Sequence, residues 1–169
     1  MKIKDKNNIP KLLKELEYLN NHKLVIGILS EQQSSEILMI ASVHEFGTDI
    51  RVTPKMRAYL HSIGIHLRAD TDEIKIPERS YLRATIDQKK DEIDKTTVKL
   101  LDGVFNLRIS ARVMLETIGG MVVSLMQEFL TDLSEPANHP VTVERKGSSN
   151  PLIDTGQLRS AITFKIERR

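Results

Sequence analysis

Three groups of residues in this sequence have types that could do chemistry, and the spacing within each group decides whether it does. Asp154-Thr155-Gly156 matches the tripeptide of aspartic peptidases, in which two carboxylates share one proton. The sequence holds this tripeptide once, so a peptidase would need two copies of the chain to build its site. A peptidase that uses Asp154 is therefore a distant alternative.

The histidines are the candidates for a metal site. His44 and Glu45 are adjacent, but no second histidine lies four residues away, so the two-histidine zinc pattern is absent. His61 and His66 are five residues apart in a segment that we interpret as extended, which places them on opposite faces of a strand. We predict no metal, no cofactor and no catalytic residue, and we expect the protein not to be an enzyme.

The third group, Lys146-Gly147-Ser148-Ser149, has the residue types of a phosphate-binding loop without its spacing of two glycines before Lys and Ser/Thr. The remaining basic residues are scattered, and a net charge of +2 argues against a dedicated DNA-binding protein. If several arginines lined one concave surface, however, they would attract phosphates regardless of the net charge. A DNA-contacting module is therefore the main alternative function.

Length and composition predict one globular domain over residues 1–169. A chain of 169 residues with 40% apolar and 28% charged residues can bury a core, and its composition does not indicate disorder. The absence of cysteine excludes disulfides and thiolate chemistry. The start of the chain, residues 1–6, is too polar for a signal peptide, and no apolar run approaches the roughly 20 residues of a membrane span. We expect a soluble protein that stays inside the cell and has no membrane partner.

Hydrophobic periodicity predicts the elements on either side of a central segment. A helix is predicted over 9–21, a strand over 22–29, and a second helix over 36–46 that ends at Gly47. Two longer helices are predicted over 81–106 and 109–133. Near the end, Asp154 or Thr155 is expected to cap a helical turn, and a strand with alternating apolar residues follows it.

The central segment 48–78 has strand-like alternation, with Met56, Ala58 and Leu60 at every second position. We interpret it as a β-hairpin or an extended arm inserted into the domain. Two interpretations of its role remain open. It either pairs with another subunit or forms a surface hairpin on its own monomer.

The predicted helix over 109–133 is apolar except for one narrow polar stripe, so it must be covered on several sides by its own fold or by a neighbouring chain. Gly119 and Gly120 lie in its middle. They indicate either a kink or a close crossing of another element.

Three motifs in order make the chain resemble the tail-completion or neck proteins of tailed bacteriophages. The first is Ala41 followed by Glu45-Phe46-Gly47, and the second is Ile76-Pro77-Glu78-Arg79-Ser80-Tyr81-Leu82-Arg83, in which Ser80 replaces the proline of many relatives. The third is the segment from Pro151 to Ile162, which follows the family pattern almost without departure. Each motif alone is weak, whereas the three in order span most of the chain.

The resemblance implies an α+β fold, with long helices packed on one face of a small antiparallel or mixed sheet. It also implies a non-catalytic structural protein of the virion that sits at the head–tail interface and is assembled in the host bacterial cytoplasm. Copies would form a ring, commonly a hexamer, between the connector and the tail-terminator or tail-tube proteins, with possible non-specific contact to genomic DNA. The motif positions that would carry structure or interaction are Glu45, Phe46, Gly47, Pro77, Arg79, Tyr81, Leu82, Arg83, Asp154, Thr155, Gly156, Leu158 and Arg159.

Within these motifs, Arg79 and Arg83 are expected to fix the start of the long helix against a carboxylate such as Glu45 or Glu78.

Overall fold

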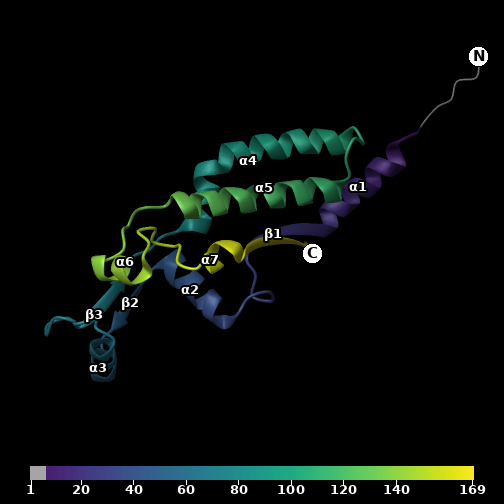
Figure 1. Cartoon of the computed structure of the whole chain (residues 1–169). Coiled ribbons are helices and arrows are strands. Elements are labelled where there is room, and N and C mark those ends of the chain that lie inside the picture. The colour runs from purple at the N-terminus through teal and green to yellow at the C-terminus, as the bar shows by residue number, and fades with distance from the viewer. Residues whose placement is uncertain (1–6) are drawn as a thin grey trace, which may run out of the picture.

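The computed structural model describes residues 7–169, so the polar start over 1–6 lies outside the described residues. The order of elements along the described chain is α1 Ile9–Asn21, β1 His22–Ile28, α2 Ser35–Phe46, β2 Thr48–Arg51, α3 Pro54–Ser62, β3 Glu73–Ile76, α4 Tyr81–Phe105, α5 Ala111–Asp132, α6 Pro140–Lys146, α7 Gln157–Ser160 and β4 Ile162–Arg168. Figure 1 shows α4 and α5 as two long rods lying above β1 and the C-terminal strand.

The two seven-residue strands β1 and β4 join the first and last parts of the chain. They pair antiparallel over their whole length, from His22 opposite Arg168 to Ile28 opposite Ile162. Both strands are rich in β-branched residues, which suit a pleated surface with one side packed on a helix. The sheet carries its apolar residues, such as Ile26 and Ile162, toward the core.

Helix α5 is the centre of the core. It begins after Ser110, whose hydroxyl accepts a hydrogen bond from the Val113 N–H at 3.2 Å. One side of α5 lies on β1 and β4, and α4 packs along another side, so the layers are helix, helix and sheet. The buried residues of α5 are Ala111, Met114, Ile118, Gly119, Val122, Leu125, Met126 and Leu130. The prediction of an α+β fold with long helices on a small sheet is confirmed, and the sheet is antiparallel.

By length and composition alone, one helix of the described chain, α5, is long and apolar enough to cross a membrane. Its place between the sheet and α4 accounts for part of this apolar surface, because the sides of α5 that face these elements carry its buried residues. The absence of a membrane partner stays a prediction.

The central segment forms an arm at one end of the molecule, away from α1 (Figure 1). The expected hairpin is present, since β2 and β3 pair antiparallel from Thr48 opposite Ile76 to Arg51 opposite Glu73. The expected extended conformation between them is wrong, because Met56, Ala58 and Leu60 lie in helix α3. The helix start signal was Thr53-Pro54: Thr53 caps the Met56 N–H at 3.2 Å, and the proline occupies the first turn.

The two histidines of the arm are also placed differently from the prediction. His61 lies next to last in α3, and its Nδ1 lies 2.7 Å from Nδ1 of His66, so the two rings form a hydrogen-bonded pair. They do not lie on opposite faces of a strand, since the chain between them turns.

The glycine pair in α5 serves close packing at Gly119. A Cβ built on Gly119 would lie 2.4 Å from a ring carbon of Phe164, which shows that β4 presses its aromatic side chain directly onto the helix backbone. A Cβ on Gly120 would meet nothing within 4 Å. Of the two interpretations of the pair, the close crossing is therefore present at Gly119.

This difference gives a matched pair of substitutions. We expect Gly119→Ala to lower the free energy of unfolding by about 1–3 kcal/mol, because the new methyl group overlaps the Phe164 ring and forces repacking. We expect Gly120→Ala to leave stability unchanged or to raise it by up to about 1 kcal/mol, since alanine favours the helix and the site is open. Urea unfolding followed by circular dichroism measures both, and equal effects would contradict the packing argument.

Candidate functional site

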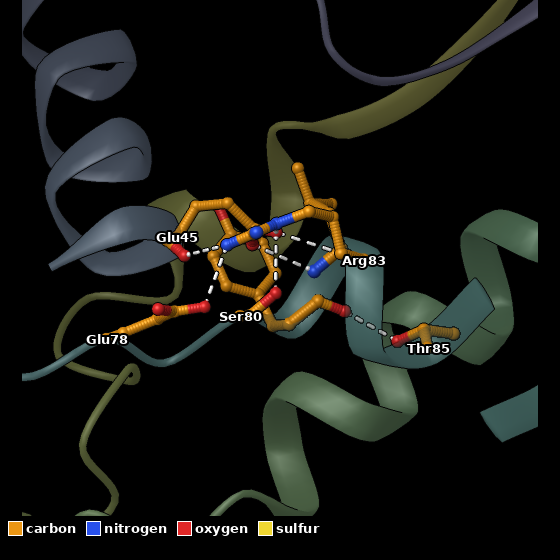
Figure 2. Close-up of polar contacts among 7 residues, drawn as sticks. Glu45, Glu78, Ser80, Arg83 and Thr85 are labelled. Carbon is orange, nitrogen blue, oxygen red and sulfur yellow. Dashed lines mark hydrogen bonds and ion pairs between the residues drawn. The ribbon is translucent and has the colours of Figure 1, made fainter. Parts of the chain in front are cut away.

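The first two motifs meet where α2 ends and α4 begins, around the side chain of Glu45. This residue lies next to last in α2 and is only 4% exposed. Ser34 caps the start of α2 and Gly47 ends it with a φ of 68°, so the helix length places Glu45 at the junction. Figure 2 shows its carboxylate with Ser80 and Arg83 directed toward it.

The Glu45 carboxylate caps α4 from outside that helix. It accepts hydrogen bonds from the backbone N–H groups of Leu82 at 3.0 Å and Arg83 at 3.1 Å. The Ser80 hydroxyl, which stands at the N-cap position but makes no cap bond of its own, donates to Glu45 at 2.9 Å. A carboxylate at this position satisfies free N–H groups of the first turn and is favoured by the helix dipole.

Arg83 adds a charged partner on the solvent side of this carboxylate. Its Nε donates to Glu45 Oε1 at 3.0 Å, and its Nη2 donates both to the Glu45 carbonyl oxygen and to Glu78 Oε1, each at 2.8 Å. The guanidinium carbon lies 4.7 Å from the ring centroid of Phe46, a cation–π contact. The hydrogen bond to Glu45 is the main cause that raises the pKa of Arg83.

Gly47 is required because the chain after β3 passes directly over it. A Cβ on Gly47 would lie 2.8 Å from the Glu78 backbone nitrogen and 3.0 Å from the Ile76 carbonyl oxygen. Its φ of 68° is also one that other residues rarely adopt. Pro77, between these two contacts, is exposed. The Glu45-Phe46-Gly47 motif thus supplies a helix cap, a platform for Arg83 and a close crossing.

Among residues 7–169, Arg79 pairs with no carboxylate, which corrects the prediction for this residue. Its buried side chain donates to the carbonyl oxygen of Pro136 at 2.8 Å, to that of Ala137 at 3.3 Å, and to Asn138 Oδ1 at 3.1 Å. Burial lowers the pKa of this guanidinium. Arg79 therefore ties the start of α4 to the loop after α5, while Arg83 alone fulfils the predicted pairing with Glu45 and Glu78.

The next two motif residues belong to the core. Tyr81 is fully buried, and its hydroxyl finds no hydrogen-bond partner among residues 7–169. Burial, together with the nearby Glu45 charge, raises the pKa of Tyr81. Its carbonyl oxygen accepts a hydrogen bond from the Thr85 hydroxyl at 2.6 Å, and Leu82 packs against the core cluster.

The third motif lies on another side of α2, and some of its residues are exposed whereas others are buried. Asp154 and Thr155 are exposed and do not cap α7, which corrects that prediction. Helix α7 instead begins after Gly156, which has a φ of 79°. Leu158 is buried beside α2 and α5, and the exposed Arg159 offers its carbonyl oxygen to Gln127 Nε2 at 3.2 Å.

Asn150 organises the loop before α7, and the sequence analysis missed its role. Its Oδ1 accepts from the N–H groups of Leu152 at 2.9 Å and Ile153 at 2.8 Å, and its Nδ2 donates to the Thr131 carbonyl oxygen at 2.7 Å. Lys146 Nζ donates to the Asn150 carbonyl oxygen at 2.9 Å. An Asn directly before Pro151 was the available signal, because Asn side chains commonly bond backbone two residues on.

A cavity of about 470 Å³ separates α2 from this loop and contains His44, Lys146 and Asp154 in its wall. Burial is the largest cause that lowers the pKa of His44 to about 4, and the positive charges of Arg79 and Lys146 act in the same direction. His44 is therefore neutral at neutral pH. Burial also lowers the pKa of Lys146, although Asp154 opposes the shift.

The structure thus brings together Glu45, Phe46, Gly47, Arg79 and Arg83 with Tyr81 and Leu82, and it leaves Pro77, Asp154 and Thr155 at the surface. The Glu45 carboxylate accepts hydrogen bonds from Ser80, Leu82 and Arg83, and it therefore acts as a helix cap. Within residues 7–169, no group of three or more histidine, aspartate or glutamate side chains is arranged to hold a metal ion.

Comparisons of this chain with protein-family models, with curated proteins and with solved structures found no match.

The cap predicts a specific cost for removing the charge on Glu45. We expect Glu45→Gln to lower the free energy of unfolding by about 1–3 kcal/mol, because the buried network loses its negative charge and an NH2 donor replaces one of its two acceptor oxygens. The matched control is Glu78→Gln, which breaks only an exposed contact to Arg83 and is expected to cost less than about 1 kcal/mol. Urea unfolding at neutral pH measures both, and a larger loss in Glu78→Gln would refute the assignment.

His44 predicts a pH dependence of stability. Its pKa is about 4 in the fold and near its ordinary 6.5 when unfolded, so the unfolded chain binds a proton first as pH falls. We expect stability to decrease between pH 6.5 and pH 4, by about 1–2 kcal/mol after allowance for partial solvent exposure, and not to depend on His44 above this window. Urea unfolding across this range should give a shallower decrease for His44→Gln than for the unchanged chain.

Proposed function

We propose that this chain is a structural virion protein of a tailed phage or prophage that acts at the head–tail junction as a tail-completion or neck protein. It assembles by subunit packing, as a hexameric ring, between the connector and the tail-terminator or tail-tube proteins. The observation that carries the proposal is the convergence of the motifs. Residues 45–47 and 76–83, which make the chain resemble that family, build one contact cluster in the fold.

The work done by the motif residues supports a structural role. Glu45 caps a helix, Gly47 admits a crossing chain, and Arg79 binds carbonyl oxygens of the loop after α5. Each of these contacts sets the relative position of elements distant in sequence. Contacts of this kind fit a protein whose function is to present shaped surfaces.

The distribution of apolar side chains supports association with other proteins. Large apolar residues are exposed on several elements, and they include Leu13, Met39, Phe46, Tyr59, Val98 and Phe105. Tyr59 is 62% exposed on α3, at the tip of the projecting arm (Figure 1). Exposed aromatic and apolar side chains of this kind are typical of contact surfaces between proteins.

A genetic test addresses the proposal directly. Deleting the gene from the phage or prophage genome that encodes it is expected to leave DNA-filled heads and separate tails, which electron microscopy of lysates distinguishes from joined virions. The unchanged gene supplied in trans should restore joining. Joined, infectious particles in the deletion strain would contradict the proposal.

Two further experiments test the alternatives: complementation of the deletion with a variant tests the peptidase, and the salt dependence of DNA binding tests the DNA-contacting module. Asp154 is exposed, so Asp154→Asn is expected to keep the fold and to restore joining as well as the unchanged gene does. A peptidase that uses this carboxylate would lose function instead. For the purified protein, binding to duplex DNA that falls steeply with salt would favour the DNA-contacting alternative.

A further inference from the structure

The sheet formed by β1 and β4 has two outer edges, and within residues 7–169 neither is paired with a third strand. Strand order in this sheet is β1 next to β4 alone. No backbone hydrogen bond joins the outer edge of either strand to another segment of residues 7–169. A two-stranded sheet with free edges is a ready template for strand addition.

The register identifies the residues whose backbone groups point outward. Arg169 lies opposite Asn21 by extension of the register, and its N–H donates to the Asn21 carbonyl oxygen at 2.8 Å. In an antiparallel pair, bonded and non-bonded pairs alternate, so the odd-numbered residues exchange the hydrogen bonds within the sheet. The N–H and C=O groups of the even-numbered residues point away from the partner strand. These residues are His22, Leu24, Ile26 and Ile28 on β1, and Ile162, Phe164, Ile166 and Arg168 on β4.

The two faces of the sheet carry different side chains. The even-numbered side chains lie toward α5, as the contact between Phe164 and Gly119 shows. On the opposite face, Lys23 Nζ lies 3.1 Å from Glu167, and Glu167 also contacts Lys165. The face toward α5 therefore carries the apolar matches Leu24–Ile166, Ile26–Phe164 and Ile28–Ile162, and the opposite face carries the charge pair Lys23–Glu167.

We propose that the outer edge of β4 binds β1 of a second copy of this chain, antiparallel and in the register that β1 already has within one copy. Leu24 of the second copy would then lie opposite Ile166, and Ile26 opposite Phe164. Lys23 of the second copy would lie opposite Glu167, which places opposite charges together. The inference rests on the proposed function, since it names the contact by which copies assemble.

Three features select a second copy as the occupant. The outward backbone groups require an extended segment, and β1 and β4 have the same length of seven residues. In the same register, every side-chain match of the existing sheet is repeated across the junction. Each copy contributes a β1 edge to one neighbour and a β4 edge to the other, which is a head-to-tail contact, and such contacts generate rings when the rotation closes.

A groove beside this end of the sheet leaves room on the α5 side. It has a volume of about 540 Å³, and its lining includes Tyr18, Arg112, Glu116, Phe164, Ile166 and Arg168. Phe164 and Ile166 are only partly buried within one copy. Added apolar side chains from a neighbouring strand would cover them further.

Cysteine cross-linking tests the register, because the natural chain has no cysteine. Lys23→Cys and Glu167→Cys are prepared as separate proteins and mixed, so that a disulfide between the two variants joins different copies only. Across the junction these positions form a non-hydrogen-bonded pair, whose Cα separation of about 4.5 Å suits a disulfide. The control mixture pairs Lys23→Cys with Asp91→Cys, an exposed position on α4. We expect roughly tenfold more mixed disulfide in the first mixture, because strand pairing raises the effective concentration.

A proline substitution tests the edge itself. Arg168 is exposed and its N–H points outward, so Arg168→Pro removes an edge donor while preserving the bonds of the existing sheet. Light scattering should show roughly tenfold weaker self-association for Arg168→Pro than for the control Arg168→Ala, which keeps the N–H. Circular dichroism verifies that both variants fold.

The outcomes separate this inference from the function on which it rests. Oligomers that persist in Arg168→Pro, or that form without the selective disulfide, would refute the strand contact and leave assembly through another surface. A chain that stays monomeric at high concentration and gives no selective disulfide would refute the contact and self-assembly together. Selective cross-linking in a chain whose deletion leaves head–tail joining intact would support the contact and contradict the proposed role.

Discussion

The buried carboxylate of Glu45 fixes the end of α2 against the start of α4. Glu45 lies next to last in α2, and its carboxylate caps the start of α4 with four hydrogen bonds from Ser80, Leu82 and Arg83. A buried anion is costly unless donors surround it, and here the donors are the first turn of a helix and an arginine. The arm formed by β2, α3 and β3 lies between these two helices in the chain. The cap therefore also brings the base of that arm together.

Positive charge gathers on the other side of the same junction. The charges of Arg79 and Lys146 lower the pKa of His44, and the charge of Arg79 also lowers the pKa of Lys146. Arg79 binds carbonyl oxygens and an amide oxygen, whereas His44 stays neutral. The start of α4 is thus attached to the loop after α5 by dipoles, and to the end of α2 by a full negative charge. Both attachments converge on residues of the same motif.

Sequence reasoning succeeded where the signal was local and failed where it depended on distant partners. The amphipathic period of α1, the β-branched run of β1 and the long apolar stretch of α5 all identified their elements closely. The arm was misinterpreted because positions 56 and 60 are compatible with both periods, and the cap signal of Thr53-Pro54 decided for a helix. Arg79 and Arg83 are equivalent in the sequence motif. Their partners differ in the fold. Arg79, which precedes α4, contacts the loop at 136–138, whereas Arg83, in the first turn of α4, contacts the end of α2.

By itself, the sequence determined helices α1, α2, α4 and α5 and strands β1 and β4, the apolar character of the central helix and the absence of thiol chemistry. These properties follow from hydrophobic period, caps and composition, which act over a few residues. Only the tertiary structure decided that Glu45 caps α4, that Gly119 lies beneath Phe164, and that β1 and β4 pair and leave their even-numbered backbone groups outward. Such contacts join residues 37 to 146 positions apart. They depend on how whole elements pack, and no local pattern encodes that packing.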